Sequence, residues 1–239
     1  MSLKAISLDI GCTLLYNTAC YGEYPSDSMA AAWNNIVSFL QGKGYDISID
    51  DVFRALKTWK NLAGIESGVD YEYWAKLMIY YVFKILGIKL KQGIIEEAYS
   101  LYINVYKTTL RPYSDVRWFL DNVKKHGLSV AAITNGSSHD VAVSALEYNN
   151  LLDYFDVVVS SQLIGYRKPS SVIFIKTAEL LGVKPQEIIH LGDDPIKDFD
   201  GAINAGYKGA ILIARHKPCE REPCFNELSR AFNYIKTIS

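Results

Sequence analysis

Residues that can do chemistry recur directly after short apolar runs of the sequence. They comprise Asp9, Gly11, Thr13, Thr134, Asn135, Gly136, Lys168, Asp193, Asp194 and Asp198. Carboxylates gathered at one site repel one another unless a hard cation lies among them, and oxygen ligands of this kind suit Mg²⁺. A threonine hydroxyl beside backbone N–H groups at a helix start binds an anion, and a lysine adds a positive charge. The set therefore predicts a phosphoryl site with a carboxylate beside a magnesium ion.

The segments that must position these residues alternate between strand and helix patterns. Strands are expected at 4–10, 129–133, 156–159, 188–191 and 209–213, and helices at 116–125, 141–148, 172–181, 199–205 and 226–235. Strict alternation implies right-handed crossovers and a parallel sheet covered on both faces. We therefore expect an α/β fold with a doubly wound, Rossmann-like parallel sheet. Ligands of such sheets collect beyond the carboxyl ends of the strands, which is where the residues above lie.

A different pattern occupies residues 25–109, where apolar residues recur at helical spacing in four successive stretches without a strand between them. This predicts an inserted all-helical cap subdomain. We divide the chain into an α/β core domain, residues 1–16 and 111–239, and a helical cap domain, residues 17–110. Tyrosines gather in this insert, namely Tyr71, Tyr73, Tyr80, Tyr81, Tyr99, Tyr102 and Tyr106. We expect their rings in the core of the cap, or, where they face the sheet, at the entrance for a substrate.

Composition excludes several classes of partner. The formal net charge of −1 provides no general attraction for nucleic acid or for an anionic membrane. The apolar runs are too short for a membrane span, so we expect a cytoplasmic protein with a small-molecule phosphate as its partner. The cysteines are Cys12, Cys20, Cys219 and Cys224. Reduced thiols are the expectation for this compartment, with a Cys219–Cys224 bridge left open. The sequence does not determine the oligomeric state.

Four segments also carry a family resemblance: LDIGCTL, AITNG, YRKP and HLGDDPIKD, in this order. They resemble the four motifs of the haloacid dehalogenase-like (HAD) superfamily, and the helical insert resembles the cap of many members. The resemblance implies that Asp9 is the nucleophile that forms an aspartyl-phosphate.

The resemblance also implies the remaining site roles. Thr134 and Lys168 would hold the phosphoryl oxygens, with Asn135 and Gly136 contributing backbone N–H groups. The ligands of Mg²⁺ would be the Asp9 carboxylate, the Gly11 carbonyl and the Asp193 carboxylate, with Asp194 and Asp198 binding directly or through water.

The first motif departs from the family pattern at Gly11. Phosphatases of the superfamily usually carry DxDxT there, and their second aspartate is the general acid and base. Loss of such a group costs on the order of 10²–10⁴-fold in rate. His139, close to the predicted phosphate cradle, is a candidate proton shuttle or an exposed residue at a helix start, whereas His190 reads as a core residue.

The function implied is that of a magnesium-dependent hydrolase, a phosphatase acting on a small phosphorylated metabolite. Three alternatives stay open. The first is a non-catalytic phosphate-binding or regulatory protein on the same scaffold. The second is a 2-haloacid dehalogenase, which uses the aspartate nucleophile without magnesium. The third is a phosphonate hydrolase, which relies on a cap lysine, and Lys57 and Lys60 fall in a suitable region.

Overall fold

The computed structural model describes residues 2–62, 74–91 and 93–238. Its larger sheet has the strand order β5 (Val157–Ser160), β4 (Ser129–Thr134), β1 (Ala5–Leu8), β6 (Ile188–Gly192), β7 (Gly209–Ile213) and β8 (Cys224–Phe225). Every neighbouring pair in it is parallel. All four residues of β1 are buried, as expected for a strand that is covered on both faces. The chain passes from β1 to β4 on one side and later to β6 on the other, so the carboxyl end of β1 is a topological switch point.

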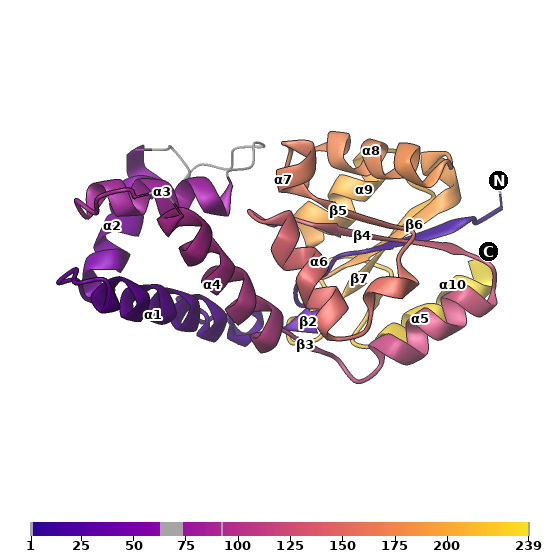
Figure 1. The fold of residues 1–239 in the computed structure, drawn as a ribbon. Coiled ribbons are helices and arrows are strands. Elements are labelled where there is room, and N and C mark those ends of the chain that lie inside the picture. Colours follow the sequence, from indigo (N-terminus) through magenta and orange to yellow (C-terminus); the bar gives the residue numbers. More distant parts are fainter. Residues whose placement is uncertain (1, 63–73, 92, 239) are drawn as a thin grey trace.

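Helices cover both faces of this sheet (Figure 1). On one face α5 (Val116–Lys125), α6 (His139–Tyr148) and α10 (Leu228–Ile238) pack around a core that includes Phe119 and Phe232. On the other face α8 (Ser171–Leu181) and α9 (Gly201–Asn204) pack around Phe174. The one-turn helix α7 (Ser161–Ile164) follows β5 directly. The predicted α/β fold with a doubly wound parallel sheet is confirmed.

The inserted segment forms a helical unit beside the sheet (Figure 1). It consists of α1 (Asp27–Gly42), α2 (Ile49–Leu62), α3 (Ala75–Ile85) and α4 (Ile94–Thr109). Apolar faces of these helices meet in a hydrophobic cluster of their own, in which Trp33 and Phe83 are the largest fully buried side chains. The short antiparallel strands β2 (Leu15–Tyr16) and β3 (Arg111–Pro112) lie where the chain enters and leaves the insert. The domain boundaries given above stay a prediction.

Tyr99 joins the insert to the core. Its hydroxyl donates to Asp140 Oδ2 at 2.8 Å and lies 2.8 Å from Ser138 Oγ, at the start of α6. Burial raises the pKa of Tyr99 to about 12. Tyr102 is buried in the insert, whereas Tyr80 and Tyr81 are exposed, so the expectation of buried rings holds for part of the set. Tyr71 and Tyr73 lie outside the described residues.

Short elements account for most differences from the predicted order. The strands β2, β3 and β8 have two residues each, which is too short for a pattern of alternation to be recognised. The helix expected at 199–205 is instead a π-helical turn, Pro195–Asp200, followed by α9. Its start is earlier because the Asp194 carboxylate accepts hydrogen bonds from the N–H groups of Ile196 and Lys197.

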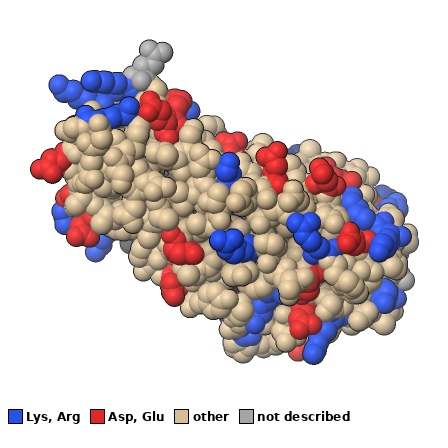
Figure 2. Space-filling model, turned by 60° about the horizontal axis from the view of Figure 1, so that its bottom comes forward, with Lys and Arg blue, Asp and Glu red and all other residues tan. Residues whose placement is uncertain are grey.

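The surface carries both signs of charge. Figure 2 shows acidic and basic side chains interspersed over one face, with uncharged surface between them. Within the described ranges, none of the helices combines the length and the apolar character needed to cross a bilayer.

The expectation of reduced cysteines is wrong. Cys12 is bonded to Cys20 and Cys219 to Cys224, with Cα–Cα distances of 5.3 and 5.9 Å. Sequence spacing alone did not require either bridge, because whether two thiols meet depends on how the intervening turns fold. Cys12 has a left-handed backbone, φ 58°, so the turn after β1 brings its side chain round toward Cys20 in the following loop.

We predict that each disulfide contributes about 2 kcal/mol to the free energy of unfolding, because it closes a short loop in the unfolded chain. Chemical denaturation of the paired Cys219→Ser and Cys224→Ser variant should show this loss. The difference from the unsubstituted protein should disappear when both are measured with a dithiol reductant. Free thiols that react in the unfolded protein before reduction would contradict the bridges.

Candidate active site

A pocket of about 440 Å³ opens beyond the carboxyl ends of β1, β4 and β6. Its lining comprises Asp9, Gly11, Cys12, Ala19, Thr134, Asn135, Arg167, Lys168, Asp193, Asp194, Lys197, Asp198 and Lys217. The structure thus brings the predicted site residues together except for two: Gly136, which lies one position beyond Asn135, and Thr13, which is buried and does not line the pocket. This volume is within the range of small-molecule sites.

Asp9 is held at the centre of this edge of the sheet. Its N–H donates to the Leu191 carbonyl at 2.9 Å, which continues the pairing of β1 with β6 by one residue. Its carboxylate is buried and accepts a hydrogen bond from Lys168 Nζ at 2.6 Å. A buried carboxylate is costly unless it is paired, so Lys168 is the partner that permits Asp9 to lie here.

Lys168 uses all three of its ammonium protons. Besides Asp9, it donates to Asp198 Oδ1 at 2.5 Å and to the Ile133 carbonyl at 3.0 Å. Asn135 fixes the backbone of this lysine, because its amide accepts from the Lys168 N–H at 2.7 Å and donates to the Lys168 carbonyl at 2.9 Å. The Asn135 side chain therefore positions the lysine, and the role predicted for its backbone in phosphate binding stays a prediction.

Asp198 is the second carboxylate on Lys168. Its Oδ2 accepts from the Asp194 N–H at 3.0 Å, and its Oδ1 lies 3.3 Å from His190 Nε2. The neighbouring Gly192 has no room for a side chain, since a Cβ there would lie 2.2 Å from Asp198 Cγ. A strand ending in glycine is thus what allows Asp198 to approach β6 this closely.

The apolar neighbours of His190 in the sequence predict a core residue, and the structure shows that its ring also contacts a carboxylate of the site. It is fully buried, and burial lowers its pKa, so the neutral ring donates from Nε2 to Asp198 and accepts from Ser7 Oγ at 2.8 Å through Nδ1. It orients a carboxylate of the site. The signal available in the sequence was its place at the head of the HLGDDPIKD segment.

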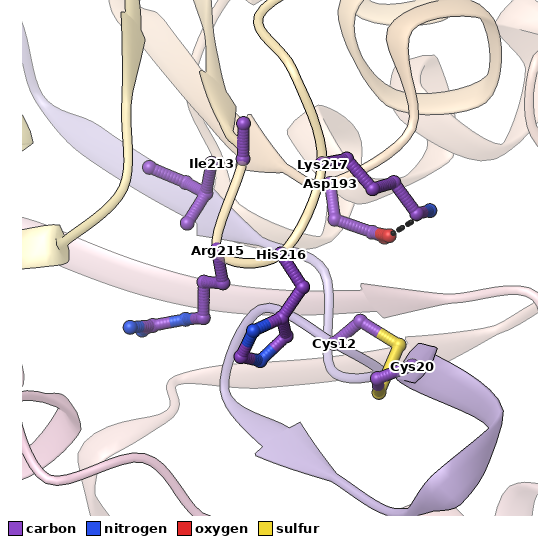
Figure 3. Close-up of a pocket in the computed structure, with 8 residues that line it drawn as sticks. Cys12, Cys20, Asp193, Ile213, Arg215, His216 and Lys217 are labelled. Atoms are coloured by element: carbon purple, nitrogen blue, oxygen red, sulfur yellow. Dashed lines mark hydrogen bonds and ion pairs between the residues drawn. A yellow bond between two sulfur atoms is a disulfide. The ribbon is translucent and has the colours of Figure 1, made fainter. Parts of the chain in front are cut away.

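Three of the four predicted carboxylate ligands converge, and Asp194 does not join them. Oxygen atoms of Asp9, Asp193 and Asp198 all lie within 4.8 Å of one another. Asp194, predicted as a fourth ligand, instead caps the π-helical turn and pairs with Lys197 Nζ at 2.6 Å. The structure does not bring its carboxylate into the cluster. Asp193 has one cationic partner at the rim, Lys217, whose Nζ lies 3.1 Å from Asp193 Oδ2 (Figure 3).

The charges of this cluster are not balanced by the two lysines. Burial raises the pKa of Asp9 to about 8; the Lys168 ammonium opposes this rise, and the carboxylates of Asp198 and Asp193 add to it. Burial, with Asp198, also raises the pKa of Asp193. Although burial opposes it, the Lys168 ammonium holds the pKa of Asp198 well below its usual range.

This donor set fits a divalent cation. Three carboxylate oxygens lie close together here, and carboxylate oxygens are the ligands that Mg²⁺ prefers. Two of these groups, Asp9 and Asp193, have raised pKa values, and a bound dication would favour their ionised forms. Asp9, Asp193 and Asp198 would hold it, together with the Gly11 carbonyl that the resemblance implies.

Gly11 leaves open space beside Asp9. A Cβ at this position would have Asp9 Oδ2 as its nearest neighbour, at 4.0 Å. The described lining of the pocket contains no histidine and no carboxylate besides the four aspartates already named. His139 contacts Ser160 Oγ at 3.2 Å and is not part of that lining. Among the described residues, the open space at Gly11 therefore holds no histidine and no further carboxylate.

We predict a pH dependence of stability that Asp9 causes. Its pKa of about 8 in the folded protein exceeds the ordinary value of 3.8, so its contribution to the free energy of unfolding is present at acidic pH and is lost as the pH rises toward 8. Denaturation of metal-free protein should show that the free energy of unfolding of Asp9→Asn increases relative to that of the unsubstituted chain as the pH rises from 5 to 8. Parallel profiles for the two proteins would contradict the assigned shift.

Comparison with known proteins agrees with this geometry. A family model described as haloacid dehalogenase-like hydrolase matches residues 72–212, more than half of the chain. A glyceraldehyde 3-phosphate phosphatase of Methanopyrus kandleri is 28% identical over 229 residues, which cover 92% of this chain and 88% of the relative. A phosphoglycolate phosphatase of Aquifex aeolicus is 27% identical over 155 residues, 65% of this chain and 72% of the relative.

Solved structures share the fold. A 2-haloacid dehalogenase from Pseudomonas syringae has a TM-score of 0.77 at 16% identity, covering 99% of this chain and 100% of its own. An HAD phosphatase from Thermococcus onnurineus has a TM-score of 0.68 at 24% identity, covering 98% of both chains. At these identities the likeness concerns the fold alone. The family model, in contrast, confirms the predicted family and its hydrolase character: the chain belongs to the haloacid dehalogenase-like hydrolases.

Proposed function

We propose that this hydrolase is a magnesium-dependent phosphatase that acts on a small phosphorylated metabolite through an aspartyl-phosphate at Asp9. The observation that carries the proposal is the ion-paired Asp9, Lys168 and Asp198 at the floor of a 440 Å³ pocket, with Asp193 completing an acidic cluster. The names of the Methanopyrus and Aquifex relatives, which specify glyceraldehyde 3-phosphate and phosphoglycolate, support a substrate of that size.

In the first step, an Asp9 carboxylate oxygen attacks the phosphorus, and the bond to the substrate oxygen breaks so that this oxygen leaves as an alkoxide and takes a proton from solvent water. Lys168 holds Oδ1 of Asp9, so the carboxylate is oriented, and its ammonium charge favours the ionised form that attacks. In the second step, water attacks the phosphorus of the aspartyl-phosphate, which releases phosphate and restores the Asp9 carboxylate.

Anionic phosphoryl oxygens need positive charge around them. Lys168 supplies one charge, and Thr134, at the end of β4, lines the same pocket. A magnesium ion bound by Asp9, Asp193 and Asp198 would offset the negative charge of both the carboxylates and the phosphate. Asp194 is left out of this ligand set because its carboxylate caps the following turn.

The glycine at position 11 limits the substrate. The leaving oxygen receives no proton from a side chain at this position, so esters with acidic leaving groups react with the least loss. A non-catalytic phosphate-binding protein would have the same floor without turnover, and a 2-haloacid dehalogenase would use Asp9 without metal.

We expect hydrolysis of p-nitrophenyl phosphate that depends on Mg²⁺ and is abolished by Asp9→Asn. The nitrophenolate leaves without protonation, so the missing acid costs little with this compound. Absence of turnover on this and on a panel of phosphate esters, with Mg²⁺ binding intact, would favour the non-catalytic alternative. Chloride release from 2-chloropropionate without added metal would favour the dehalogenase.

A second experiment tests the role of the open space at Gly11. The substitution Gly11→Asp should raise the rate with alkyl phosphates by on the order of 10²–10⁴-fold and change the rate with p-nitrophenyl phosphate much less. Gly11→Asn is the matched control, since it fills the same space without an ionisable group. Equal rates for both variants and the original protein on alkyl phosphates would show that proton transfer is not what the site lacks.

A further inference from the structure

We propose that Lys217 competes with a divalent cation for Asp193 and thereby lowers the affinity of the acidic cluster for metal. This inference rests on the magnesium site proposed above. Its geometric basis is the ion pair between Lys217 Nζ and Asp193 Oδ2, 3.1 Å apart, in which the two side chains point toward each other (Figure 3).

The two lysines of the cluster differ in their freedom to leave. Lys168 is buried and bound to three acceptors, so it stays whether or not a cation binds. The Lys217 side chain is 52% exposed, whereas that of Asp193 is 18% exposed. Lys217 can therefore return to solvent when another cation takes Asp193, and Asp193 cannot follow it.

The chain before Lys217 is anchored, which keeps the lysine at the cluster. Arg215 pairs with both oxygens of Asp115, at 2.8 and 3.1 Å, and donates to the Thr13 carbonyl. The His216 ring lies 4.6 Å from the ring of Tyr21, centroid to centroid, and its Nε2 lies 3.1 Å from the Tyr113 hydroxyl.

A second constraint follows Lys217 in the sequence. The Cys219–Cys224 disulfide closes the loop that leads into β8. Anchors on both sides restrict Lys217 to one side of the pocket, so its ammonium is presented to Asp193 at a high local concentration.

A metal ion that binds Asp193 must first displace the Lys217 ammonium from this carboxylate. The displaced ammonium then stays near the bound metal ion. Both effects oppose binding, the first through the lost ion pair and the second through repulsion between like charges. At this exposure they amount to about a two- to tenfold weakening of Mg²⁺ affinity. Removing the charge of Lys217 should therefore strengthen metal binding.

The test is a titration of metal-free protein with Mg²⁺, in which binding is measured by isothermal titration calorimetry and by the rise in melting temperature. Lys217→Met should bind Mg²⁺ about two- to tenfold more tightly than the unsubstituted protein, and Lys217→Arg should restore the weaker affinity. Lys197→Met is the matched control, because this lysine is also 52% exposed on the pocket rim but pairs with Asp194, outside the cluster. Its affinity should stay close to that of the unsubstituted protein.

The outcomes separate the two proposals. If the unsubstituted protein binds Mg²⁺ and Lys217→Met binds it equally well or more weakly, the proposed role of Lys217 is wrong, while the proposed metal site stands. A gain of the same size in Lys197→Met would also overturn it, since the effect would then be general to the charge of the rim. An unsubstituted protein that binds no Mg²⁺ would overturn the metal site and, with it, this inference.

Discussion

The ammonium of Lys168 between the carboxylates of Asp9 and Asp198 is the interaction on which the rest of the site depends. Neither carboxylate is exposed enough for water to stabilise its charge, so each needs this partner. The fold meets the requirement by placing β1 between β4 and β6, which brings residues more than a hundred positions apart to one sheet edge. The Asn135 side chain holds the backbone of Lys168 through two hydrogen bonds, and the His190 ring contacts the Asp198 carboxylate and orients it.

Much of this arrangement could be predicted from the sequence. The strands are short apolar runs, and the carboxyl ends of parallel strands meet at one edge, so Asp9, Thr134 and Asp193 were expected together. The pattern could not show which of the three carboxylates after β6 stays outside the cluster. That choice depends on the Asp194 side chain, which caps the next turn and leaves Asp198 to face Lys168.

Other features depended on contacts that no local pattern records. His190 looks like a core residue because its neighbours in β6 are apolar, and its partner Ser7 lies 183 positions away in the chain. The sequence leaves the Cys219–Cys224 bridge open and does not indicate the Cys12–Cys20 bridge, because disulfides depend on the path of loops rather than on helix or strand periodicity. Next to Asp193, the segment with the Cys12–Cys20 disulfide lies close to His216 and Lys217 (Figure 3).

The central claim is that Asp9 carries a phosphoryl group during turnover. Rapid acid quench of the protein with p-nitrophenyl phosphate and Mg²⁺, followed by peptide mass spectrometry, tests it most directly, since acid preserves an acyl phosphate long enough for digestion. We expect the added mass of one phosphoryl group on the peptide that contains Asp9, and its absence in Asp9→Asn. Turnover in which no phosphorylated peptide is trapped, or in which the group is found on another residue, would contradict the account.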